Sequence, residues 1–226
     1  MTLVASERPV ETSEQAQPAL LSQRFTGGSA WRRDDIAPGE WIVPITPDAM
    51  AELNTIAGAF AEFEGSVEEL APDAFDWPAT TEIMVEIQSR LNNGIGFAVL
   101  DGLPTERWGE RASRAVSWLL TNMLAPAIKQ KLKGARVYDV RDTGAKLKYG
   151  VRRSITNLSQ EFHTDGSFLA GSPNYLTLAC LHQAEAGGVS RVASLTMAHN
   201  ILMDTAPQHL ARLYRPFWWD RQAEEL

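Results

Sequence analysis

The chain has 226 residues, of which 44% are hydrophobic and 22% are charged. This length and this proportion of hydrophobic to charged residues are typical of one globular domain and argue against general disorder. A net charge of −7, from 21 basic and 28 acidic side chains, disfavours a partner held by phosphate neutralisation, so we expect no nucleic acid. No apolar run approaches the roughly 20 residues that cross a bilayer, and the single cysteine, Cys180, has no disulfide partner, so we expect a cytoplasmic protein without a membrane span.

The chain reads as a short tail followed by one domain. Residues 1–24 are rich in Ser, Thr, Glu, Gln and Pro and have no sustained apolar period, which predicts a disordered tail. We interpret residues 25–226 as a single domain that is helical over 25–93. Short strands dominate later in the chain, so the pattern favours an α+β fold in which helices pack against a sheet.

The first predicted elements follow from apolar spacing and from capping residues. They are a strand at 41–45, a helix from Thr46 to about residue 63, a helix from Thr80 or Thr81 to about Asn93, a buried strand at 96–100 and a helix at 106–130. After Gly134 the pattern changes to strands and turns. Strands are predicted at 135–140, 155–162, 174–182 and 190–195, and helices at 198–204 and 205–214. Cys180 lies in the third of these strands and is interpreted as a buried packing residue.

The most informative short pattern is the His-X-Asp of His163 and Asp165. In an extended chain residues i and i+2 point to the same face, about 6–7 Å apart, so one imidazole and one carboxylate can converge on a single cation. Iron(II) suits this mixed donor set, and the positions left open can take an oxo-acid and dioxygen. The pattern alone leaves another interpretation open, because a lone histidine is more often a hydrogen-bonded polar residue and Asp165-Gly166 is an ordinary turn pair.

The surroundings of this pattern resemble the TauD/TfdA family of Fe(II)/2-oxoglutarate-dependent oxygenases. The resemblance covers about residues 94–226. It is carried by Phe162 to Phe168 around the metal motif, by Ser172-Pro173 with the strand at 174–182, by Gly187-Gly188-Val189-Ser190, and by Gly96 to Leu100, which is similar to the strand that opens the family's core. The resemblance implies a double-stranded β-helix, the clavaminate synthase-like jelly roll, over residues 94–226.

The same resemblance implies site residues and cofactors. His163 and Asp165 would hold Fe(II), and the hydroxyl of Ser190, 27 residues after His163, would contact a carboxylate of 2-oxoglutarate. The Gly187-Gly188 pair also predicts a tight turn with positive φ, although a plain hairpin with a solvated Ser190 has the same signature. With dioxygen as the second co-substrate, the expected reaction is hydroxylation or desaturation of an aliphatic carbon, and the presence of Asp165 disfavours halogenation.

The sequence departs from the family pattern downstream. The family has a second histidine ligand and an arginine that pairs with 2-oxoglutarate, and neither can be placed in this chain. The remaining histidines are His182, expected at a strand end, and His199 and His209, expected on helix surfaces. The chain stops after an aromatic cluster at 217–219, so we expect a jelly roll that is incomplete at its C-terminus. Its open sheet edges would favour pairing with another chain, such as a homo-oligomer.

The substrate is expected to be a small polar molecule. Arg152, Arg153, Asn157 and Gln160 precede the metal motif and are candidates for a polar pocket, with solvent-facing positions as the alternative. One rival function is a truncated or degenerate binding module without catalysis. A zinc hydrolase is a second rival, disfavoured because the chain has no His-X-X-X-His or cysteine-rich partner set.

Overall fold

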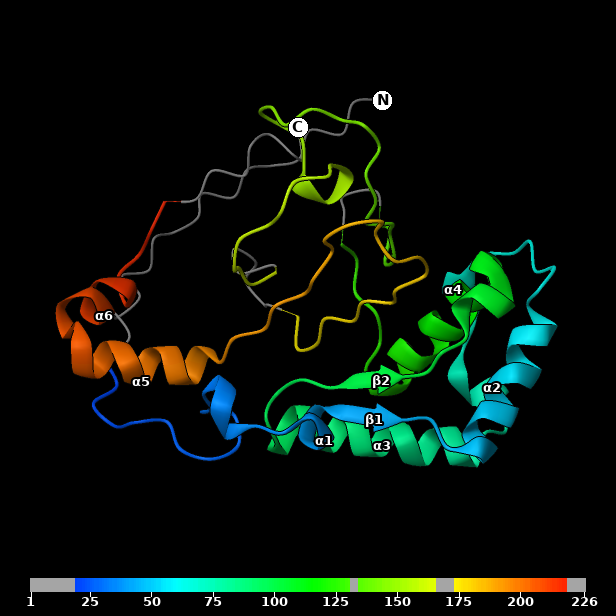
Figure 1. The fold of residues 1–226 in the computed structure, drawn as a ribbon, viewed down its shortest axis with the longest axis horizontal. Helices are drawn as coiled ribbons and strands as arrows, with labels where there is room; N and C mark the ends of the chain where they lie inside the picture. The colour runs from blue at the N-terminus through cyan, green and yellow to red at the C-terminus, as the bar shows by residue number, and fades with distance from the viewer. Residues whose placement is uncertain (1–18, 131–133, 166–172, 219–226) are drawn as a thin grey trace, which may run out of the picture.

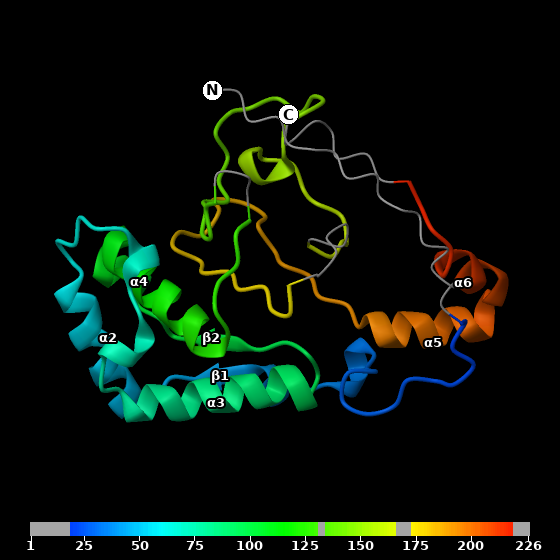
Figure 2. The same ribbon diagram turned by 180° about the vertical axis from the view of Figure 1, so that it is seen from behind.

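The computed structural model describes residues 19–130, 134–165 and 173–218. Along these residues a group of helices is followed by a long stretch without regular elements, and two further helices come last (Figures 1 and 2). The helices are α1 (Pro38–Trp41), α2 (Pro47–Ala59), α3 (Pro78–Asn93), α4 (Thr105–Leu124), α5 (Leu195–Thr205) and α6 (Pro207–Leu213), the strands are β1 (Ile42–Pro44) and β2 (Val99–Asp101), and single 3-10 turns are η1 (Arg33–Asp35), η2 (Val67–Glu69), η3 (Pro72–Ala74) and η4 (Arg153–Ile155). No helix in the described ranges is both long and apolar enough to span a bilayer.

The hydrophobic core lies between α2, α3 and α4, which pack on one another (Figure 1). Leu53 in α2, Ile87 in α3 and Leu119 in α4 are 1%, 6% and 0% exposed. Their burial follows from the helical spacing of apolar residues that the sequence contains. The helical part predicted for residues 25–93 is therefore confirmed for its two long helices, and α4 completes their core.

The ends of the helices differ from the prediction for local reasons. The helix expected to reach residue 63 stops at Ala59. The next helix begins at Pro78, before the predicted caps Thr80 and Thr81, because proline is well suited to the first helical position. The helix expected to reach residue 130 stops at Leu124, since Ala125 precedes a proline and is extended, with φ −166° and ψ 154°.

The two strands form a parallel pair, in which Ile42 is the register partner of Val99. β1 confirms the strand predicted at 41–45, and β2 overlaps only the end of the strand predicted at 96–100. That second strand is not buried on both faces, because Val99 is 43% exposed. The described sheet has only these two strands, so β2 is an edge strand rather than a central one.

The predictions of strands at 135–140, 155–162, 174–182 and 190–195 are wrong for this structure, in which these residues form no strand. Ile155 ends η4 and Leu195 begins α5, and the other residues of these ranges lie in no helix. A strand requires a continuous ladder of backbone hydrogen bonds with a neighbour. In the first two segments the described contacts are isolated, such as the N–H of Arg141 donating to Ser154 O (3.1 Å) and that of Thr143 to Ile155 O (3.0 Å). The structure is therefore a mixture of helices with few strands, and it does not by itself display a jelly roll.

The segment around Cys180 is also more exposed than predicted. Leu176 is 59% and Leu178 is 71% exposed, and Cys180 is a free, exposed thiol instead of a buried packing residue. The prediction of burial was wrong because alternating apolar residues are buried only when a second layer covers their face. No such layer covers this segment in the described residues.

The start of α3 is capped by a side chain from another helix. Trp77, at the N-cap position, provides no side-chain hydrogen bond. The Glu52 carboxylate of α2 instead accepts hydrogen bonds from the N–H groups of Ala79 (3.0 Å) and Thr80 (2.8 Å) and from the Thr80 hydroxyl (2.7 Å). Burial raises the pKa of Glu52, but these three hydrogen bonds outweigh it and leave the pKa below its ordinary value.

We expect Glu52→Ala to lower the free energy of unfolding by about 1–2 kcal/mol at pH 7, the usual cost of losing a helix cap. Because the folded-state pKa is lowered, this contribution is present above the unfolded-state pKa of about 4.3 and is lost as the pH falls through the folded-state value. Urea unfolding of both proteins at pH 7 and near pH 3 measures the difference. Thr55→Ala, which removes an exposed hydroxyl bonded within α2, is the control. A pH-independent difference between Glu52→Ala and the unaltered chain would contradict the assignment.

Residues 24–31, called here the N-terminal strap, connect α5 to the loop that precedes β2 (Figure 1). The buried Asn200 side chain accepts from the Phe25 N–H (2.9 Å) and donates to the Phe25 carbonyl (2.8 Å), and Arg24 forms an ion pair with Asp204. At the other end the Trp31 indole donates to Ile95 O (2.8 Å). Of the tail predicted for residues 1–24, the structure describes only 19–24, which are exposed and lack regular elements, so that prediction stays untested for the rest.

Candidate functional site

The side chains of His163 and Asp165 face one another, as the His-X-Asp spacing predicts. His163 Nε2 and Asp165 Oδ1 are 3.5 Å apart, and the two side chains are 44% and 48% exposed. Both lie on an irregular segment that follows η4, and the strand expected before them at 155–162 is not formed. The two groups therefore approach one another without a sheet, in a segment that includes a bend at Phe162 and a turn at Asp165.

Two neighbours fix the orientation and tautomer of the His163 ring. Nδ1 lies 2.7 Å from the backbone oxygen of Glu161, and because a carbonyl only accepts, Nδ1 carries the proton. Nε2 then has a free lone pair, which accepts a hydrogen bond from the Gln160 amide nitrogen at 3.1 Å. A histidine that donates through one nitrogen to a backbone carbonyl and presents the other as a lone pair is arranged as metal-binding histidines are.

The donor pair fits a divalent cation. In the neutral imidazole both atoms of the 3.5 Å pair are acceptors, and a cation bound between them would offset their repulsion. Bonds of about 2.0–2.2 Å from nitrogen and oxygen to one ion place two donors about 3.0–3.4 Å apart, close to the separation found here. An imidazole with a carboxylate is the donor set that Fe(II) accepts in oxygenases with open coordination positions.

A third ligand is not found among the described residues, where no group of three His, Cys, Asp or Glu side chains is placed to hold a metal. His209 is exposed, as expected, and His182 is exposed on a segment that forms no strand. His199 is half-buried instead of lying on a helix surface, because its Nε2 is 2.9 Å from the Tyr214 hydroxyl and its ring packs on Phe25. The described part of the chain therefore offers two candidate ligands, His163 and Asp165.

The turn before Ser190 has the backbone conformation that the glycine pair predicts. Gly187 and Gly188 have φ values of 78° and 68°, and a Cβ on Gly188 would lie 3.0 Å from the Ala184 Cβ. Ser190 itself is exposed and starts no strand. Its neighbour Arg191 places its guanidinium over the Phe162 ring, with the Arg191 Cζ 5.1 Å from the ring centroid. This contact joins the segment that contains Ser190 to the segment that contains His163.

The candidate substrate residues fall in different surroundings. Gln160 contacts His163, as described above. Asn157 lines a cavity of about 310 Å³, and Arg153 is turned toward its own loop, where it donates to Ser159 O at 2.8 Å. Of Arg153, Asn157 and Gln160, the structure thus brings Gln160 into contact with a predicted metal ligand. The motif residues 166–168 and Ser172 lie outside the described residues.

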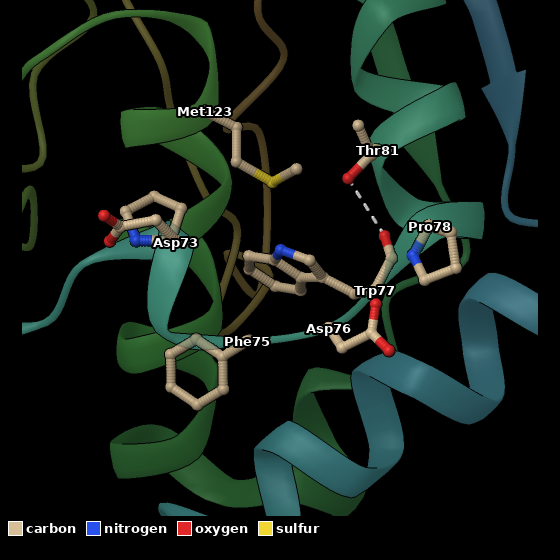
Figure 3. Close-up of a pocket in the computed structure, with 8 residues that line it drawn as sticks. Asp73, Phe75, Asp76, Trp77, Pro78, Thr81 and Met123 are labelled. Carbon is tan, nitrogen blue, oxygen red and sulfur yellow. Dashed lines mark hydrogen bonds between the residues drawn. The ribbon is translucent and has the colours of Figure 1, made fainter.

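A second cavity of the described residues lies elsewhere (Figure 3). It has a volume of about 470 Å³ and opens between η3, the start of α3 and the end of α4, with Trp77 and Met123 in its wall. The Thr81 hydroxyl donates to the Trp77 carbonyl at its edge (Figure 3). None of the predicted site residues lines this cavity, so its size does not make it the candidate site.

Sequence reasoning missed Arg191. The residue follows Ser190 directly, and a basic residue next to a proposed carboxylate-binding hydroxyl is a signal that the sequence already contained. Its contact with Phe162, however, spans 29 positions (191 − 162), and no periodicity predicts a contact at that separation.

Comparisons with known proteins identify the family of the chain. The model of the family described as "Taurine catabolism dioxygenase TauD, TfdA family" matches residues 66–225. The FR-33289 synthase of Streptomyces rubellomurinus is 29% identical over 209 residues, which cover 91% of this chain and 60% of that protein. The taurine hydroxylase-like protein SAT17 of Stachybotrys chartarum is 24% identical over 215 residues, which cover 89% of this chain and 50% of that protein.

The chain thus spans 50–60% of the length of these two relatives. The family match extends from η2 of the helical part to beyond α6, and it includes the facing pair of His163 and Asp165, the glycine turn and Ser190. The chain therefore belongs to the TauD/TfdA family of dioxygenases.

Proposed function

We propose that this chain carries the Fe(II)- and 2-oxoglutarate-binding residues of a dioxygenase that hydroxylates or desaturates an aliphatic carbon of a small polar molecule, with CO2 and succinate as co-products. The observation that supports it most is the facing pair of His163 Nε2 and Asp165 Oδ1 at 3.5 Å. The family is one of dioxygenases that use Fe(II) and 2-oxoglutarate. Bound iron would supply the oxidising power, by activating dioxygen against the oxo-acid.

Each residue has a defined part in this proposal. His163 and Asp165 hold the ion from one side, and the Glu161 carbonyl keeps the imidazole in the tautomer that can ligate. The Gln160 amide, now bonded to His163 Nε2, would turn away when metal binds and become a donor for a polar ligand. Ser190 would donate its hydroxyl to a 2-oxoglutarate carboxylate from the neighbouring segment.

Asn157 and Lys146 share the wall of the cavity of about 310 Å³, and we include them as candidates for contact with a polar substrate. Lys146 forms no ion pair with the carboxylates of the described residues. A cation and an amide in one wall suit an anionic or hydrogen-bonding group of a small molecule.

The finer fold proposal is the double-stranded β-helix of the family. Support comes from the exposed alternation of Leu176 and Leu178, which have the spacing of one face of a strand. We propose that residues 174–182 become a strand when another strand pairs with them. Exposed apolar residues of this kind also favour self-association, so a homo-oligomer is part of the proposal.

Formation of succinate tests the function directly. The purified chain is incubated with Fe(II), 2-oxoglutarate and dioxygen, and succinate is quantified with and without a panel of small polar compounds. We expect slow uncoupled succinate formation that is absent without iron. Absence of both succinate and any anaerobic visible charge-transfer band, in this chain and in any longer form of the protein, would contradict the proposal.

A non-catalytic binding module on the same fold is the second candidate. The observation that favours it is the lack of a third metal ligand among the described residues. It predicts that 2-oxoglutarate or a related anion binds without succinate being formed. The same incubation, with binding measured by calorimetry, separates the two functions.

A further inference from the structure

Arg191 lies where two segments of the candidate site meet. Its backbone follows Ser190, and its guanidinium lies over the ring of Phe162, the residue before His163. The Cζ to centroid distance of 5.1 Å is within the range of a cation–π contact. Arg191 therefore belongs by its main chain to the Ser190 segment and by its side chain to the metal motif.

The edge of this guanidinium is available to a ligand. An arginine that stacks on a ring uses the face of its planar group, and the five N–H donors around the edge remain free to bind. Arg191 is exposed and, within the described residues, forms no hydrogen bond or ion pair. The other arginines in this region differ, since Arg141 pairs with Asp139 and Glu110, and Arg136 pairs with Glu68.

The stacking contact also limits the positions that the charged Arg191 guanidinium can adopt. A free arginine on an exposed loop samples many rotamers, and ordering it for a ligand costs free energy. Contact with Phe162 orders the Arg191 side chain before a ligand binds, so less of that entropic cost remains at binding. Phe162 is the residue directly before His163. The positive charge is therefore kept beside the metal motif before any ligand arrives.

We propose that Arg191 binds the oxyanion group of a ligand at the His163–Asp165 pair, with its guanidinium edge donating to a carboxylate or sulfonate while its face stays on Phe162. The inference rests on the proposed function and adds a specific anion-binding residue to it. Planar bidentate pairing with two oxygens is the interaction for which arginine is best suited. The anionic group belongs either to 2-oxoglutarate or to the substrate, and the experiment distinguishes the two.

The test measures anion binding apart from turnover. Isothermal titration under anaerobic conditions gives the dissociation constants of 2-oxoglutarate and of ethanesulfonate for the chain, with and without Fe(II), and the constant of Fe(II) alone. We expect Arg191→Gln to raise the dissociation constant of one of the two anions by about 10- to 100-fold, which is the effect of losing a charge-assisted hydrogen-bonded pair. The affinity for Fe(II) alone should not change.

Three further variants make the result specific. Arg191→Lys keeps the charge without the planar edge and should recover only part of the affinity. Phe162→Leu removes the ring and keeps the cation, so an intermediate loss is expected. Arg212→Gln is the matched control, because Arg212 also stacks on a phenylalanine, Phe217, with its Cζ 4.0 Å from the ring centroid, but lies in α6.

The outcomes separate this inference from the proposed function. A loss for 2-oxoglutarate alone assigns Arg191 to the co-substrate, and a loss for ethanesulfonate alone assigns it to the substrate. Unchanged binding of both anions in Arg191→Gln, or an equal loss in Arg212→Gln, overturns the inference while leaving the metal site intact. A chain that binds no Fe(II) contradicts the proposed function. The dissociation constants of the two anions measured without metal then test the role of Arg191.

Discussion

Replacing His163 with alanine is expected to lower the affinity of the chain for Fe(II) by more than about 100-fold. Loss of an outer partner of a metal ligand already costs about 10- to 100-fold, so loss of a direct donor should exceed that range. Only one other donor, Asp165, faces the same point among the described residues. Asp165→Ala should have an effect of the same order, and anaerobic titration with Fe(II) in the presence of 2-oxoglutarate measures both.

His209→Ala is the control for this prediction. His209 is exposed on α6 and contacts no other member of the candidate site, so its removal should leave Fe(II) binding unchanged. The expected pattern is a large loss for two variants and none for the third. Equal Fe(II) affinity in His163→Ala and in the unaltered chain would show that the 3.5 Å pair is only an ordinary polar contact.

The largest effect on stability is expected in the helical core. Leu119 is completely buried in α4, where that helix packs on α2 and α3. Leu119→Ala should lower the free energy of unfolding by about 2–5 kcal/mol, because it removes apolar contacts and leaves a cavity that the three helices fill only in part. Each kcal/mol lowers the Tm by about 2–4 °C in a chain of this size. Thermal and urea unfolding followed by circular dichroism measure the loss.

Val85→Ala provides the comparison within the same bundle. Val85 is 60% exposed on α3, so its truncation should change the free energy of unfolding by less than about 0.5 kcal/mol. A Leu119→Ala protein as stable as Val85→Ala would mean that α4 does not form a core with α2 and α3 in solution. In that case the helical part could not act as the support of the candidate site.

The sequence pattern predicts an element correctly where the interactions that form the element join residues close together in the chain. The spacing of Leu53 and Ile56 in α2 and of Ile83 and Ile87 in α3 predicts those helices, since their hydrogen bonds are made inside the segment. The facing of His163 and Asp165 is equally local, because the two residues are only two positions apart in the chain. The positive φ of Gly187 and Gly188 belongs to the same class.

Contacts between distant segments are not predicted by any pattern in the sequence. The pairing of Glu52 with the start of α3 joins positions 28 apart, and the contact of Phe25 with Asn200 joins positions 175 apart. The four strands expected after Gly134 needed neighbours that the described residues do not provide, and Cys180 is exposed for the same reason. A strand is stabilised by its partner, so apolar alternation alone cannot form one.

The sequence by itself determined the two long N-terminal helices, the glycine turn, the proximity of His163 and Asp165 and the resemblance to a dioxygenase family, because each depends on residues close together in the chain. Only the tertiary structure decided that Arg191 lies on Phe162, that the N-terminal strap holds α5, and that the segments after Gly134 are not strands. The physical reason is the entropic cost of closing long loops. A contact between distant residues forms only when the packing of the whole chain is favourable enough to exceed the conformational entropy that the contact removes.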